Sequence, residues 1–187
     1  MDEVTGFIVT YGVGKLLDEF LARLPTKLDA LTRAKQEMIE AAARKVREAL
    51  EAQARKNSDF ETRLATAITE REATALFLRL LPEAAVANTH ERMEMLACAL
   101  AGLFQPDLTS EMRSRVSRAL MQLEPSDVVE LRKLDEAQRA PGVNPAPEMT
   151  PERELLVFAG LIERGGVYPN ALGRAVLSTL REWAPRS

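Results

Sequence analysis

Residues 91–104 read ERMEMLACALAGLF, and this stretch decides the fold class. After its polar start, apolar residues such as Met95, Leu96 and Leu100 fall on nearly every face of a helix. A helix that is apolar all round is stable only when other elements surround it. We therefore predict that residues 91–104 form the central buried helix of an all-α protein.

The chain before this stretch carries further helix signals. Asn88 with Glu91 forms a start signal for the central helix, and Ser58 with Glu61 forms a capping box for the helix before it. That earlier helix is expected to end at Pro82, because proline interrupts helical hydrogen bonding.

The chain after this stretch also carries signals for the starts of helices. Thr109 is expected to cap one helix, and Pro125 is expected to begin the next helix. Thr150 followed by Pro151 predicts a further helix start, and Asn170 predicts the last one. The inward side of the last helix is expected to carry Leu172, Val176, Leu180 and Trp183.

A long helix is predicted over residues 26–56. Its apolar residues recur at steps of three and four and form a narrow stripe. At ~1.5 Å per residue the helix would be roughly 45 Å long, more than a domain of this size needs to cover its own core. A helical partner, from the same chain or from a second copy, is the natural inference. The predicted partner-binding residues are Leu31, Ala34, Met38, Ala42, Val46, Ala49 and Ala52.

These signals together predict a helical bundle of six to eight helices in residues 1–138. Residues 139–149 contain three prolines and a glycine and are expected to be a linker. Residues 150–187 would then form a small C-terminal appendage, either all-α or similar to a winged helix. Residues 6–14 contain three glycines and are compatible with an extended lead-in, a loosely packed helix or a membrane-surface anchor.

Composition narrows the functional class. The chain has 187 residues, 46% of them hydrophobic, and a formal net charge of −3, without the basic excess of a dedicated nucleic-acid binder. No apolar run is long enough to span a membrane, and the first residues lack a secretory signal. The single cysteine fits a reducing compartment, so a cytoplasmic location is expected.

No catalytic, metal-binding or cofactor-binding residues are predicted. His90 is the only histidine and is expected at an exposed helix start, away from a nucleophile. Cys98 lies on the most apolar helix, where a thiol behaves as a small hydrophobic group. One histidine and one cysteine do not provide the usual ligand set for zinc. A role other than that of an enzyme is therefore expected.

A group of basic residues leaves a nucleic-acid role open. A surface of positive side chains on two successive helices could contact phosphates, although interleaved charges more often form a solvated, salt-bridged face. The candidate residues are Arg113, Arg115, Arg118, Arg132 and Lys133.

Residues 155–168, LLVFAGLIERGGVY, resemble the second helix and wing of winged-helix proteins. In that family a helix ends in Gly-Leu-Ile and a short hairpin follows. The resemblance implies a nucleic-acid-binding element. The stretch departs from the DNA-binding version because Glu152 and Glu154 open the helix, and acidic side chains there would repel phosphates.

A broader resemblance covers residues 91–134, the Gly160-Leu161-Ile162 ending and the later run Leu172-Gly173-Arg174. Residues 91–104 followed by MRSRVSRALMQLEPSDVVELRKL at residues 112–134 are similar in pattern to bacterial helical proteins of the abortive-infection alpha type. That resemblance implies a cytoplasmic, non-enzymatic bacterial protein that acts in phage defence.

The sequence thus predicts a helical interaction protein that binds a protein partner or a second copy through its long helix. The alternative is a nucleic-acid-binding regulator that uses the winged-helix-like C-terminal element.

Overall fold

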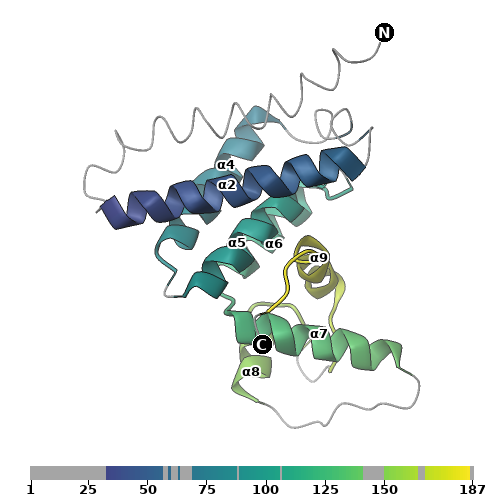
Figure 1. The fold of residues 1–187 in the computed structure, drawn as a ribbon. Helices are drawn as coiled ribbons and strands as arrows, with labels where there is room; N and C mark the ends of the chain where they lie inside the picture. Colours follow the sequence, from purple (N-terminus) through teal and green to yellow (C-terminus); the bar gives the residue numbers. More distant parts are fainter. Residues whose placement is uncertain are drawn as a thin grey trace.

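Seven helices pack together in the part of the chain that the structure describes (Figure 1). This computed structural model describes residues 33–56, 59, 63, 69–87, 89–105, 107–140, 150–163 and 167–185. The fold is all-α, as predicted. The helices are α2 (Arg33–Lys56), α4 (Glu70–Ala85), α5 (His90–Leu103), α6 (Ser110–Leu120), α7 (Pro125–Arg139), α8 (Pro151–Phe158) and α9 (Ala171–Thr179).

Helix α5 lies at the centre, which confirms the prediction for residues 91–104. It contacts α2, α4, α6, α7 and α9, and Met95, Leu96 and Leu100 have no exposed surface. Its N-cap is Thr89, whose hydroxyl accepts a hydrogen bond from the Arg92 N–H at 3.1 Å. The predicted start at Asn88 lies outside the described residues.

Helix α4 differs from its prediction, because it continues through Pro82 to Ala85. Proline removes one hydrogen bond, yet the last turn still closes through a bond from the Val86 N–H to the Pro82 carbonyl at 3.1 Å. Leu81 and Ala84 are buried on either side of the proline, and their burial favours the extra turn. The expected capping box at residues 58 and 61 lies outside the described residues.

The predicted caps of the later helices are confirmed. Thr109, Thr150 and Asn170 each accept a hydrogen bond from a backbone N–H in the first turn of their helix. Pro125 and Pro151 occupy the first position of α7 and α8, where a missing N–H costs nothing.

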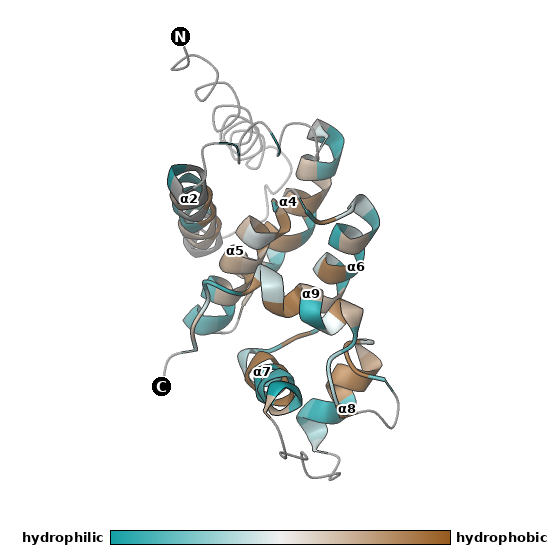
Figure 2. Ribbon diagram, turned by 90° about the vertical axis from the view of Figure 1, so that its right-hand side faces the viewer, coloured by the Kyte–Doolittle hydropathy of each residue, from teal (hydrophilic) through white to brown (hydrophobic). Residues whose placement is uncertain are grey.

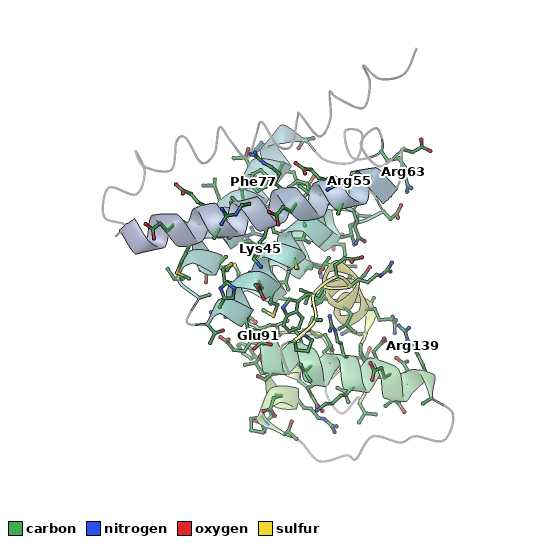
Figure 3. The ribbon with its side chains drawn as sticks, in the orientation of Figure 1. Lys45, Arg55, Arg63, Phe77, Glu91 and Arg139 are labelled. Carbon is green, nitrogen blue, oxygen red and sulfur yellow. The ribbon has the colours of Figure 1, made fainter. Side chains whose placement is uncertain are left out.

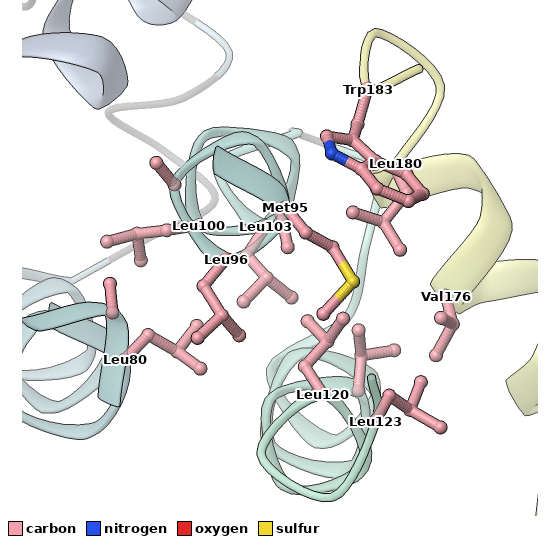
Figure 4. Packing of buried hydrophobic residues seen from close by; sticks show 14 of the residues in the cluster. Leu80, Met95, Leu96, Leu100, Leu103, Leu120, Leu123, Val176, Leu180 and Trp183 are labelled. Atoms are coloured by element: carbon pink, nitrogen blue, oxygen red, sulfur yellow. The ribbon is translucent and has the colours of Figure 1, made fainter. Parts of the chain in front are cut away.

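The C-terminal helix α9 packs against α5, α6 and α7. The four residues predicted on its inward side are all buried, and three of them, Val176, Leu180 and Trp183, lie beside core residues of α5 and α6 in Figure 4. The described residues after the linker therefore share one hydrophobic core with the rest of the bundle. Of the predicted linker at residues 139–149, Arg139 is the last residue of α7 and Ala140 is its C-cap, while residues 141–149 lie outside the described part, as do residues 6–14.

The described residues between α8 and α9 contain no strand. Ile162 and Pro169 form an isolated antiparallel bridge, and residues 164–166 are outside the described part. The strands of a winged helix are thus not seen in the described residues. None of the described helices is both long and apolar enough to cross a membrane.

Candidate interaction surface

The apolar stripe of α2 holds this helix on its own bundle. Ala42 and Val46 have no exposed surface, and Ile39 and Leu50 are buried beside them. Among the described helices, α2 contacts α4 and α5, and these two helices pack on the stripe. A second copy could reach Ala42 or Val46 only if α2 left the bundle.

Two of the other predicted interface residues are partly covered as well. Met38 is half-buried and packs against the core, and Ala52 is half-buried. Leu31 and the side chains of Ala34 and Ala49 lie outside the described part. The described residues of the predicted stripe, Met38, Ala42, Val46 and Ala52, thus pack within the chain.

The opposite face of α2 is charged and faces solvent. Its exposed residues recur at helical spacing from Glu37 to Arg55. The helix lies on the outside of the described bundle and is seen nearly along its axis in Figure 2. The Arg55 guanidinium lies 4.0 Å from the Glu51 carboxylate, and its Nε donates to the Glu51 carbonyl at 3.3 Å. The exposed charged residues of this face, here called the outer face of α2, are Glu37, Glu40, Arg44, Glu48, Glu51 and Arg55.

Arg113 is a structural residue and does not belong to a basic surface. Its side chain is only 1% exposed. It donates from Nε to the Leu103 carbonyl at 3.0 Å and from Nη2 to the Gln105 carbonyl at 3.0 Å, and Nη1 lies 3.4 Å from the Glu72 carboxylate. These bonds fix the end of α5 and the loop that follows it. A phosphate group cannot reach this guanidinium.

Arg132 is also occupied within the fold. It donates to the carbonyls of Leu180 and Trp183 at 2.8 and 2.5 Å, and its guanidinium lies 5.2 Å from the centre of the Trp183 ring. Burial lowers the pKa of Arg132 from its ordinary value, and the nearby Glu136 acts in the opposite direction. The side chain holds the end of the chain against α7.

The three remaining basic candidates are exposed, and each has a partner on its own helix. Arg115 lies 4.0 Å from Glu111, and Lys133 lies 3.9 Å from Glu130. Arg118 donates to the Ser114 carbonyl at 3.2 Å. Acidic neighbours offset the charges of Arg115 and Lys133, so the five residues do not form one positive surface suited to phosphates.

The outer side of α4 carries apolar residues that sequence reasoning missed. Leu78 is 48% exposed and Val86 is 51% exposed, and they share one side of the helix with Ala75 and Pro82. The signal was present in the sequence, because the apolar residues of this segment exceed one helical face. Phe158, at the end of α8, is a third large exposed hydrophobic residue, at 83%.

A small polar cluster joins α2 to α5. The Lys45 ammonium lies 2.5 Å from the Glu94 carboxylate, and His90 Nε2 lies 3.2 Å from the same oxygen (Figure 3 labels Lys45). Cys98 is half-buried nearby. Burial raises the pKa of the Cys98 thiol, Lys45 lowers it, and Glu94 and Glu182 raise it. A thiol in such surroundings is a poor nucleophile.

No group of three or more histidine, cysteine, aspartate or glutamate side chains in the described residues is arranged to hold a metal ion. Comparisons of the chain with models of protein families, with curated proteins and with solved structures gave no match.

Proposed function

We propose that this chain is a helical interaction protein that self-associates through α2. The observation that carries the proposal is the position of α2: it lies on the outside of the bundle, and its outer face is exposed from Glu37 to Arg55. At ~1.5 Å per residue, the 24 residues of α2 span roughly 36 Å. A second helix of the same length could lie along this face.

The chemistry of the outer face determines the kind of association. Its exposed side chains are charged, and exposed ion pairs contribute only about 0.2–1 kcal/mol each. A contact between two single helices also buries less area than the roughly 1,600 Å² of a standard protein interface. The association is therefore weak, concentration-dependent and sensitive to salt.

The proposal is tested by measuring the mass of the purified protein by light scattering. We expect dimers at about 0.05 M salt and an increasing monomer fraction at about 0.5 M salt, where charges are screened over about 4 Å. A protein that remains monomeric at its highest soluble concentration under both conditions would contradict the proposal.

The apolar side of α4 is the competing contact surface. Leu78 and Val86 are exposed on one side of this helix, and they are the apolar side chains that a partner would cover there. If α4 makes the contact, Leu78→Glu and Val86→Glu will each abolish dimers, and added salt will strengthen association instead of weakening it. Phe158→Glu is the matched control, since it places the same charge at an exposed apolar position on α8.

The cellular role proposed with this activity is phage defence in a bacterium, which rests on the pattern of residues 91–134. It is tested by counting phage plaques on bacteria that express the wild-type protein or a monomeric variant. Equal plaque numbers with and without the wild-type protein would contradict the role but leave self-association standing.

A further inference from the structure

We propose that two copies pair through antiparallel α2 helices about a two-fold axis that passes between Arg47 and Glu48. In this register Arg44 of one copy meets Glu51 of the other, and Glu40 meets Arg55. The inference rests on the proposed self-association and specifies its geometry.

The order of acidic and basic residues along α2 supports this pairing register. Glu40, Arg44, Glu51 and Arg55 are all exposed on the outer face. Glu40 and Arg44 are one turn apart, as are Glu51 and Arg55, so each end of the outer face carries one acid–base pair. The order is acid then base at both ends. Reversing the direction of the second helix therefore places base opposite acid at every one of these positions.

The result is a cluster of four charges with alternating sign at each end of the contact. One copy contributes Glu40 and Arg44, and the other contributes Glu51 and Arg55. The two-fold axis produces two such clusters, as expected for an interface in which both copies use the same surface. Each charge then has one opposite charge on its own helix and another across the interface.

A parallel pair in register lacks this complementarity. A parallel pair in register would place Arg44 against Arg44 and Glu51 against Glu51, and like charges in contact are unfavourable. The proposed antiparallel register avoids these contacts between like charges.

The contact between Arg44 and Glu51 can be separated from effects within one helix. The two residues are seven positions apart, about 10.5 Å along the axis, and do not touch within a single helix. Exchanging their charges would place an acidic side chain at position 44, between Glu40 and Glu48, and a basic side chain at position 51, beside Arg55. Within a single helix the exchange is therefore unfavourable. Across the proposed interface it is favourable relative to the single variant, because the new glutamate at position 44 faces the new arginine at position 51 of the other copy.

The test compares Arg44→Glu with the double variant Arg44→Glu/Glu51→Arg by analytical ultracentrifugation at low salt. We expect the single variant to dimerise at least about tenfold more weakly than wild type, because both symmetry-related contacts become repulsive. The double variant is expected to recover most of the lost affinity. Arg115→Glu, which makes the same change of net charge on α6, is the matched control and should dimerise like wild type.

Two results would overturn the register. One is a wild-type dimer that Arg44→Glu leaves unchanged, in which case self-association stands and another surface makes the contact. The other is a double variant that dimerises more weakly than the single variant. A wild-type protein that is monomeric at low salt would instead contradict self-association itself. Circular dichroism spectra should match wild type for every variant used.

Discussion

Gly102 of α5 lies directly against the backbone of Thr179 of α9. A Cβ atom added at Gly102 would overlap the Thr179 carbonyl oxygen and would lie 2.6 Å from the Thr179 Cα. Both residues are buried, so neither backbone can move aside without disturbing the core. This close approach fixes the C-terminal helix on the central helix.

Gly102→Ala is therefore expected to destabilise the fold by about 2–4 kcal/mol, since even one extra methyl group forces α9 away from α5. Denaturation with urea measures the effect. Gly160→Ala is the contrasting variant: Gly160 has a φ of 72° but nothing within 4 Å of an added Cβ. It should cost only about 1 kcal/mol, the penalty for a left-handed alanine. Equal losses for the two variants would contradict the tight packing of α5 on α9.

Arg113→Ala is expected to cost about 3–5 kcal/mol, because it removes a buried charge that satisfies two backbone carbonyls and faces Glu72. Arg115→Ala, two residues along the same helix and 50% exposed, should change stability by less than about 0.5 kcal/mol. Thermal unfolding of both variants provides the comparison. A mild effect of Arg113→Ala would mean that its carbonyl contacts are dispensable.

Arg132→Ala is expected to loosen the end of the chain. The variant loses the hydrogen bonds to the Leu180 and Trp183 carbonyls and the contact with the Trp183 ring. Because Trp183 is the only tryptophan, its fluorescence reports on this contact. Emission should shift to longer wavelength, and quenching by acrylamide should increase. Lys133→Ala, at the exposed neighbouring position, should leave the spectrum unchanged.

Alkylation of Cys98 should be slow at neutral pH. Only the thiolate reacts, and burial together with Glu94 and Glu182 raises the thiol pKa above its ordinary value of 9.0. The rate should therefore rise about tenfold per pH unit from neutral pH and level off only near that raised pKa. Lys45→Ala should slow the reaction further, because Lys45 lowers the pKa. Mass spectrometry with iodoacetamide measures the rate, and the protein unfolded in urea serves as the fast reference.

The helical fold could be predicted from the sequence because its signals are local. Thr109, Thr150 and Asn170 are capping residues whose effect depends on the next three residues, and each was found in the predicted role. The central position of α5 followed from its uniform apolarity. The end of α4 could not be predicted in this way. The burial of Leu81 and Ala84 in the core favours another helical turn, and this outweighs the hydrogen bond that Pro82 cannot donate.

The surfaces could be predicted less well, because exposure depends on contacts between distant segments. Helical spacing places Arg113 on the side of Val116 and Leu120 and Arg115 on the opposite side, but spacing alone does not show that a charged side chain on the inner side is buried. The apolar stripe of α2 was found correctly, but periodicity alone cannot show whether a stripe meets the same chain or a second copy. Only the structure shows that the stripe is covered and that the charged side of α2 is exposed.

Mixing two monomeric variants tests antiparallel pairing of α2 most directly. Arg44→Glu and Glu51→Arg should each be monomeric alone at low salt, because each places like charges in both contacts. In a one-to-one mixture, the glutamate introduced at position 44 of the first variant meets the arginine introduced at position 51 of the second. The unchanged Glu51 of the first variant then meets the unchanged Arg44 of the second. Light scattering of the mixture should therefore give the mass of a dimer. A mixture that remains monomeric, while the wild type forms dimers under the same conditions, would contradict the pairing.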